Sequence, residues 1–135
     1  MAYHTTWGTT TELVPDMADG HKSFYGKARV RQGDVLTADC DYNTVRELYS
    51  YGTKVAAIYL DQDDGPIIII GRPYLFGATT GRHFRAFTRQ NADGVAYGIA
   101  AIRKVWNDGA DVLNNNLVDA YTWNAAFSDR KGYRF

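Results

Sequence analysis

We expect the function of the chain to depend on the stretch Ala78-Thr79-Thr80-Gly81-Arg82-His83-Phe84-Arg85-Ala86-Phe87-Thr88-Arg89, which is predicted to be a helix with two different faces. At 3.6 residues per turn, a helix over this stretch places its arginines on one stripe, and places Phe84 and Phe87, with His83, on another. We expect the phenylalanines to pack on a sheet and the guanidinium groups to reach solvent together, where they suit phosphate or carboxylate. The arginines are Arg82, Arg85 and Arg89.

The amino-terminal end of this predicted helix is rich in small hydroxyl residues. Thr79 or Thr80 is expected to cap the helix, because a threonine hydroxyl accepts a hydrogen bond from a first-turn amide. The turn from Gly77 to Gly81 could also cradle an anion at the helix amino terminus, although the spacing and the lysine of a P-loop are missing. The other interpretation is structural, with the threonines and His83 fastening the helix to the sheet.

Residues 22–31 are predicted to form a half-exposed strand with a basic outer face. Ala28 and Val30 alternate with basic residues there, and a period of two is typical of a strand with one buried face. Gln32-Gly33-Asp34 is expected to turn after this strand. The bases that point outward are Lys27, Arg29 and Arg31.

Further strands are predicted between residues 45 and 70. Thr44 and Glu47 have the spacing of a capping box, but the many β-formers from Val45 to Tyr59 favour a strand over a short helix. Asp61 to Gly65 is expected to be a hairpin turn and not a calcium loop, since its glycine falls one position early. Ile67-Ile68-Ile69-Ile70 has the continuous apolar character of a strand buried on both faces, or of the centre of the sheet.

Together these elements predict an α+β fold, a small antiparallel β-sheet packed against one or two α-helices. The sheet would come from residues 22–72, and the helices from residues 80–90 and 95–106. Residues 1–21 are expected to be an irregular amino-terminal arm or a short edge strand, and residues 22–135 to form a single domain. We expect the aromatic and basic segment from Arg130 to Phe135 to be a frayed terminus.

The composition is that of a globular chain without net charge. Its 135 residues carry 15 basic and 15 acidic side chains, so indiscriminate coating of nucleic acid is not expected. Two segments without acids, residues 21–31 and 65–91, could still form one positive face if they adjoin in space. No apolar run reaches the roughly 20 residues of a membrane span, and no metal or cofactor motif is present. Cys40 is the only cysteine, which excludes an internal disulfide and fits a reducing cytoplasm.

A combination of three segments is distinctive. The segments are Lys22-Ser23-Phe24-Tyr25-Gly26-Lys27-Ala28, Leu48-Tyr49-Ser50-Tyr51-Gly52-Thr53-Lys54-Val55-Ala56, and Ala78-Thr79-Thr80-Gly81-Arg82-His83 with Phe87. Together they resemble a family of small proteins from phages and prophages of Gram-positive bacteria, classed as a domain of unknown function. The resemblance covers about residues 22–90. It implies a phage origin and a place of action in the cytoplasm of the infected bacterial host, and it implies no activity.

Three functions are compatible with these features. We expect a small non-enzymatic protein that binds a host or phage protein, or a virion component, because arginine and aromatic side chains are common hot-spot residues. The alternative is binding of DNA or RNA, with phosphates on the helix arginines and on the basic strand of residues 27–31. A second alternative is a small enzyme in which His83 acts as a base beside Ser50 or Thr53. No cofactor, metal ligand or membrane contact is predicted, and the candidate binding residues are Arg82, Arg85, Arg89, Lys27, Arg29, Arg31, Tyr25, Thr79, Thr80 and His83.

Overall fold

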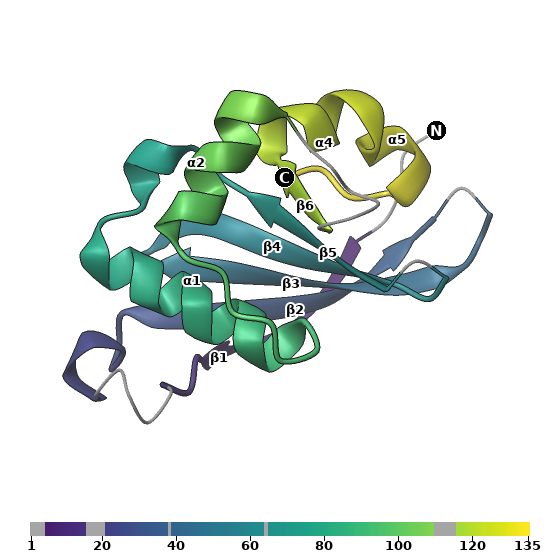
Figure 1. Cartoon of the computed structure of the whole chain (residues 1–135). Coiled ribbons are helices and arrows are strands. Elements are labelled where there is room, and N and C mark those ends of the chain that lie inside the picture. Colours follow the sequence, from purple (N-terminus) through teal and green to yellow (C-terminus); the bar gives the residue numbers. More distant parts are fainter. Residues whose placement is uncertain (1–4, 16–20, 38, 64, 110–115) are drawn as a thin grey trace.

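The computed structural model describes residues 5–15, 21–37, 39–63, 65–109 and 116–135. Within these residues the strands form one six-stranded sheet in the order β1-β2-β3-β4-β5-β6 (Figure 1). The first five strands each pair antiparallel with the next, and the sixth pairs parallel with the fifth. The strands are β1 (Thr5–Glu12), β2 (Ala28–Leu36), β3 (Tyr42–Ser50), β4 (Thr53–Asp61), β5 (Gly65–Ile70) and β6 (Leu117–Asp119).

Helices cover both faces of this sheet. The α-helices used below are α1 (Ala78–Asn91), α2 (Ile99–Asp108), α4 (Ala120–Ala126) and α5 (Ser128–Lys131), and the short 3-10 helices are η1 (His21–Ser23) and η2 (Pro73–Leu75). Helices α1 and α2 pack on one face, and α4, α5 and the residues after them pack on the other (Figure 1). The predicted α+β fold is therefore confirmed. No helix in the described ranges combines the length and the apolar composition that crossing a membrane requires.

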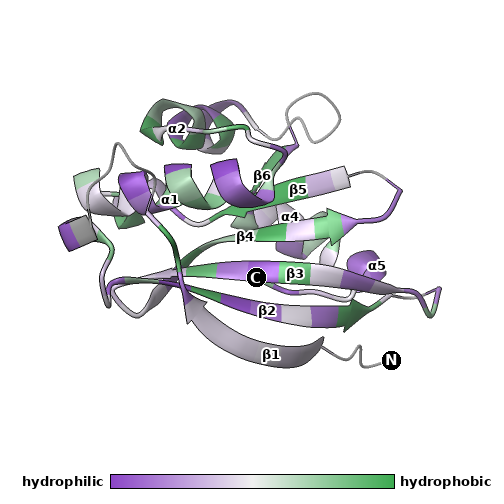
Figure 2. Ribbon diagram, turned by 90° about the horizontal axis from the view of Figure 1, so that it is seen from below, coloured by the Kyte–Doolittle hydropathy of each residue, from purple (hydrophilic) through white to green (hydrophobic). Residues whose placement is uncertain are grey.

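The sheet separates two hydrophobic cores, because burial alternates along its central strands. On β5, Ile68 and Ile70 join the core under α1 and α2, whereas Ile67 and Ile69 join the core under α4. The predicted strand buried on both faces is thus confirmed. Figure 2 shows hydrophobic stretches on β4 and β5, while β1, at the edge of the sheet, has none.

The main prediction for α1 is confirmed. Phe84 and Phe87 are fully buried, and the three arginines of the helix are exposed. The predicted threonine cap is wrong, because Gly77 occupies the N-cap position and supplies no side-chain bond. Thr80 is instead buried, with its hydroxyl oxygen 2.8 Å from that of Ser50 on β3. A hydroxyl that faces the core must find its hydrogen-bond partner there.

Three predicted boundaries are wrong, and one strand is confirmed. The strand predicted over residues 22–31 begins only at Ala28, because η1 and a turn closed by hydrogen bonds to the carbonyl of Phe24 occupy the residues before it. Residues 32–34 do not turn but continue β2. A β-carbon on Gly33 would lie 2.8 Å from the ring of Trp7 on the neighbouring strand, so the glycine lets that ring lie close to the backbone. Helix α2 begins at Ile99 and not at Val95, because Gly98 is its extended N-cap. The preference for a strand over a helix near Glu47 is confirmed by β3.

Segments near both ends of the chain contribute to the packing. Of the two interpretations given for residues 1–21, the edge strand is observed as β1, which pairs with β2 with a register shift between Trp7 and Thr10. Whether residues 22–135 form a domain by themselves stays a prediction. The predicted frayed terminus is wrong, because Tyr133 is buried and Trp123 Nε1 donates to its carbonyl oxygen at 2.9 Å. Burial of the Tyr133 ring offsets the entropy lost when the segment is ordered.

Candidate functional site

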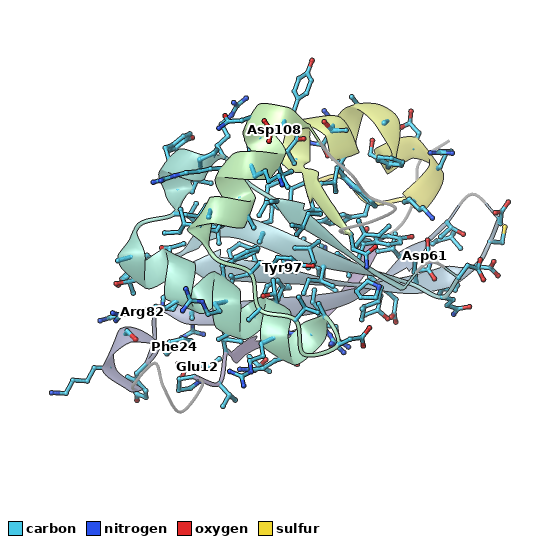
Figure 3. All side chains as sticks on the ribbon, viewed as in Figure 1. Glu12, Phe24, Asp61, Arg82, Tyr97 and Asp108 are labelled. Atoms are coloured by element: carbon cyan, nitrogen blue, oxygen red, sulfur yellow. The ribbon has the colours of Figure 1, made fainter. Side chains whose placement is uncertain are left out.

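Three segments that are far apart in sequence meet at one end of the sheet. They are the turn after η1, the hairpin between β3 and β4, and the start of α1. Atom Nε2 of His83 on α1 lies 2.5 Å from the carbonyl oxygen of Ser23 in η1. Figure 3 shows Arg82 of α1 and Phe24 at the same end of the sheet. The fold therefore gathers in one place the three segments whose combination is distinctive in the sequence.

A buried polar network joins these segments. Ser50 Oγ on β3 lies 2.9 Å from Nδ1 of His83 and 2.8 Å from the hydroxyl oxygen of Thr80. A carbonyl oxygen only accepts, so the contact with Ser23 requires the hydrogen of the His83 ring on Nε2. In the neutral ring Nδ1 then accepts from the Ser50 hydroxyl, and Ser50 accepts from Thr80. The network ties helix α1 to β3 and to η1.

The Ser50–His83 contact resembles a nucleophile with its base, but both side chains are enclosed. His83 is fully buried and Ser50 almost so. The Phe24 ring packs edge-on against the imidazole at 4.8 Å between centroids, and the Tyr51 ring lies 5.9 Å from it. A nucleophile must be reached by its substrate. The geometry therefore favours the structural interpretation, in which Thr80 and His83 fasten the helix to the sheet.

Tyr51 stands at the tip of the hairpin in an unusual backbone conformation. Its φ is 52° and that of Gly52 is 79°, while Ser50 and Thr53 pair on either side. Two positive φ values in a two-residue loop are typical of a type I′ turn, whose first central residue is usually Asn, Asp or Gly. A bulky residue in this region costs about 1–2 kcal/mol. The Tyr51 amide donates to the carbonyl of Lys27 at 2.8 Å, which joins the hairpin to the neighbouring turn.

The outer side of this end carries exposed aromatic and basic side chains. Tyr25 is 79% exposed and Tyr51 is 58% exposed. Lys27 and Arg82 are also exposed, and Thr79 is half-buried in the first turn of α1. We call the set of Tyr25, Lys27, Tyr51 and Arg82 the Tyr25–Tyr51 surface.

The other predicted basic residues are divided between the two faces of the sheet. Arg85 and Arg89 continue the exposed stripe along α1. Arg29 and Arg31 project from the opposite face of β2, since Ala28 and Val30 face the core under α1. Arg29 pairs with Glu12 at 3.8 Å. The two acid-free segments therefore meet only through Lys27 and Arg82, and Arg29 and Arg31 lie apart from the α1 arginines.

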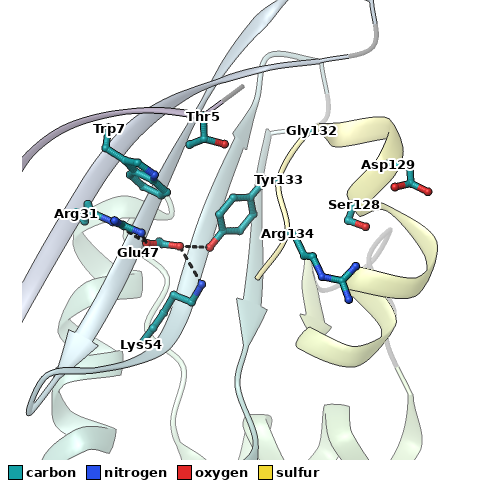
Figure 4. A pocket seen from close by; sticks show the side chains of 10 residues that line it. All are labelled: Thr5, Trp7, Arg31, Glu47, Lys54, Ser128, Asp129, Gly132, Tyr133 and Arg134. Atoms are coloured by element: carbon teal, nitrogen blue, oxygen red, sulfur yellow. Dashed lines mark hydrogen bonds and ion pairs between the residues drawn. The ribbon is translucent and has the colours of Figure 1, made fainter. Parts of the chain in front are cut away.

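On that opposite face a carboxylate is held by two cations and two phenols (Figure 4). Glu47 on β3 is only 1% exposed. Its cross-strand neighbour Arg31 donates to Oε1 from Nη2 at 2.7 Å and from Nε at 3.0 Å. Lys54 Nζ donates to Oε2 at 3.2 Å, the Tyr49 hydroxyl donates to Oε1 at 3.0 Å, and the Tyr133 hydroxyl donates to Oε2. Each carboxylate oxygen is thus fully used as an acceptor.

These groups line a hollow of about 390 Å³, which we call the Glu47 pocket. Strand β1 supplies Trp7, and the guanidinium carbon of Arg31 lies 3.6 Å from the centroid of its ring. Helix α5 and the residues after it close the other side with Asp129, Tyr133 and Arg134 (Figure 4). The pocket is therefore built by the first four strands and the carboxyl-terminal segment together.

Charge and burial set the protonation of this cluster. Burial alone raises the pKa of Glu47, but the hydrogen bonds from Tyr133 and Arg31 and the charge of Lys54 outweigh it, so that the pKa lies below the ordinary value of 4.5. The pKa of Tyr133 is raised, first by burial and then by the adjacent charge of Glu47. The pKa of Tyr49 is raised for the same two reasons. The glutamate is therefore ionised and both phenols are protonated at neutral pH.

Sequence reasoning missed most of the Glu47 pocket. Arg31 was among the candidates, but Glu47 was considered only as a capping-box residue. One signal was available: on a strand over residues 42–50, Glu47 shares a face with the apolar Val45, and an acid on an inward face requires a cationic partner. Trp7 and Tyr133 gave no such signal, because their approach depends on the tertiary fold.

Comparison with known proteins places the chain in one family. Residues 11–99 match the model of a family of unknown function, DUF8033. Comparisons with curated proteins and with solved structures give no match. The matched residues include all three segments that meet at the Tyr25–Tyr51 surface, whereas Trp7 and Tyr133 lie outside the match. Because the match covers more than half of the chain, this protein belongs to the DUF8033 family.

Proposed function

We propose that this chain is a small non-enzymatic binding protein that engages a host or phage protein through the Tyr25–Tyr51 surface. Its resemblance to phage and prophage proteins supports a phage origin and action in the cytoplasm of the infected bacterium. Tyrosine and arginine are enriched among the residues that dominate protein interfaces. Here both kinds of side chain are exposed at the place where the three distinctive segments meet.

The conformation of Tyr51 is the observation that carries the proposal. A tyrosine in the left-handed backbone conformation lowers the stability of the fold, whereas asparagine or glycine would adopt this conformation with little strain. The exposed part of its ring gains little from the fold in return, since more than half of the side chain faces solvent. Strain that folding does not require is often retained for a functional contact. The buried Ser50–His83 network beneath it holds the hairpin in place, so the tyrosine meets a partner without being ordered first.

Nucleic-acid binding is the alternative, and the arrangement of charge supports it less well. Arg31 is paired with Glu47, and the basic strand lies on the face opposite α1. A phosphate contact would therefore rest on the arginines of α1 and on Lys27, without the other bases of the predicted strand. Binding to a short oligonucleotide that weakens steeply with added salt would support this alternative over the protein partner.

Tyr51→Asn is expected to abolish capture of the partner while leaving the fold intact. Asparagine accepts a positive φ, so the free energy of unfolding should stay within about 1 kcal/mol of the wild type, or rise. Loss of a hot-spot tyrosine costs about 2 kcal/mol or more in binding, which corresponds to a weakening of at least tenfold. Affinity capture from a lysate of a Gram-positive host, followed by titration of the captured protein, measures the binding, and urea unfolding measures the stability.

Tyr121→Asn is the matched control, since Tyr121 is 70% exposed on α4, away from this surface. It should capture the same protein as the wild type. The double change Arg82→Ala with Arg85→Ala should behave like Tyr51→Asn, with binding lost and folding nearly unchanged. Capture that survives both the Tyr51 change and the arginine changes would contradict the proposal.

A further inference from the structure

We propose that the Glu47 pocket is a second binding site, for a small ligand that carries a phosphate group. The pocket lies on the face of the sheet opposite α1 and shares no residue with the Tyr25–Tyr51 surface. Its volume of about 390 Å³ falls within the range of small-molecule sites. The proposal does not depend on the protein-binding function.

The side chains that line the Glu47 pocket carry an excess of positive charge. Three cations line the pocket, Arg31, Lys54 and Arg134, against the two carboxylates of Glu47 and Asp129. Glu47 is buried and draws both Arg31 and Lys54 to itself. A single carboxylate compensates only one of these two charges, so the wall of the pocket keeps a positive excess. An anionic ligand would complete the balance.

Arg31 and Lys54 also keep N–H groups that Glu47 does not use. Arg31 uses Nε and one N–H group of Nη2 on Glu47, which leaves the two N–H groups of Nη1 and the second one of Nη2. Lys54 uses one of its three N–H groups on the same carboxylate. Both side chains remain partly solvated, at 33% and 26% exposed, although their shared partner is buried. Among the described residues, Glu47 is the only acceptor placed against these two cations by a hydrogen bond or ion pair.

The cations of the pocket are held in place before any ligand binds. The guanidinium carbon of Arg31 lies 3.6 Å from the centroid of the Trp7 ring. Glu47 accepts hydrogen bonds from one edge of the same guanidinium group. Lys54 Nζ lies 4.7 Å from the centroid of the Phe135 ring and 5.8 Å from that of Tyr133. Cations held by a buried carboxylate and by aromatic rings lose little entropy when a ligand binds. A phosphate group suits such a fixed set of donors, because its oxygens accept several hydrogen bonds at once.

The binding test uses inorganic phosphate, phenyl phosphate and benzoate, titrated into the full chain by calorimetry. We expect saturable binding of phenyl phosphate, tighter than that of inorganic phosphate or benzoate. Arg134→Gln should weaken phenyl phosphate binding by roughly tenfold, since a charged hydrogen bond contributes about 1.5–3 kcal/mol. Lys54→Gln should do the same. Arg103→Gln, an exposed arginine on α2 across the sheet, is the matched control and should bind like the wild type.

The Arg134→Gln variant keeps the test decisive if Lys54→Gln proves unstable. Arg134 is exposed, and its guanidinium group is not bonded to Glu47. Absence of saturable binding by phenyl phosphate would overturn the proposal. Equal weakening by Arg103→Gln, or equal affinity for benzoate, would also overturn it. Binding of an oligonucleotide without binding of phenyl phosphate would assign the pocket to nucleic acid instead. Tyr51→Asn should retain phenyl phosphate binding, so failure of either proposal can be distinguished from failure of the other.

Discussion

Replacement of Glu47 by glutamine is expected to lower the free energy of unfolding by roughly 3 kcal/mol. The substitution keeps the shape of the side chain but removes the negative charge that Arg31 and Lys54 share. The new amide nitrogen would also face donors, because the Tyr133 hydroxyl and Lys54 both point at Oε2. A buried hydroxyl left without an acceptor costs about 1–3 kcal/mol. Urea-induced unfolding at neutral pH measures the difference.

Glu12→Gln is the matched control for this change. Glu12 pairs with Arg29 at 3.8 Å, and about half of each side chain is exposed. Such surface pairs contribute about 0–1 kcal/mol, so the control should unfold almost like the wild type. A similar loss of unfolding free energy in Glu47→Gln and Glu12→Gln would contradict the idea that burial makes the Glu47 cluster important for stability.

The same carboxylate is expected to make stability depend on pH in the acid range. The pKa of Glu47 is lowered in the folded state, from an ordinary value of 4.5. The unfolded chain therefore binds a proton here at a higher pH than the folded chain does. The contribution of Glu47 is complete above pH 4.5, and it is lost as the pH falls through the lowered pKa. Between neutral and acid pH, the free energy of unfolding should fall less steeply for Glu47→Gln than for the wild type. Parallel pH profiles of the two proteins would refute this assignment.

Gly132→Ala is expected to cost roughly 3 kcal/mol or more. Gly132 follows α5 with φ at 73°, where an alanine is strained. Its β-carbon would also overlap the backbone carbonyl oxygen of Leu36 and approach the Val35 side chain to 3.1 Å. The Gly132 backbone cannot move away freely, because Tyr133 follows it directly and is hydrogen-bonded to Glu47. Thermal or urea unfolding measures the loss.

Gly94→Ala separates the two causes of that cost. Gly94 has φ at 80°, but no atom lies within 4 Å of the β-carbon position. Only the backbone strain applies there, at about 1–2 kcal/mol. Equal costs at the two glycines would show that the carboxyl-terminal segment does not approach β2 as closely as described.

Local periodicity was sufficient to predict the parts of the fold that depend on neighbours in sequence. The inward phenylalanines of α1 follow from helical spacing, and the double burial of residues 67–70 follows from their unbroken apolar run. The hydroxyl of Thr80 could not be assigned in this way. A threonine at the start of a helix can cap it or turn inward, and the presence of Ser50 across the core decides between the two.

The candidate sites depended more on pairing between distant residues. Tyr25, Thr80 and His83 were recognised in the sequence as one group, and the fold does bring their segments together. Charge alone suggested that the basic strand and the arginines of α1 could form one positive face. They lie on opposite faces because a strand alternates its side chains and α1 covers only one face. The partnership of Arg31 with Glu47 required the β2–β3 register, which the sequence did not supply.

The register shift in β1 has a consequence for the behaviour of the protein at high concentration. An open sheet edge offers unpaired backbone groups to other chains, and this is a frequent route to aggregation. In β1 the regular ladder is interrupted between Trp7 and Thr10, and no hydrophobic stretch lines the strand. A foreign strand could therefore not align along its full length or bury apolar surface on it. An irregular, threonine-rich edge of this kind disfavours edge-to-edge stacking of strands.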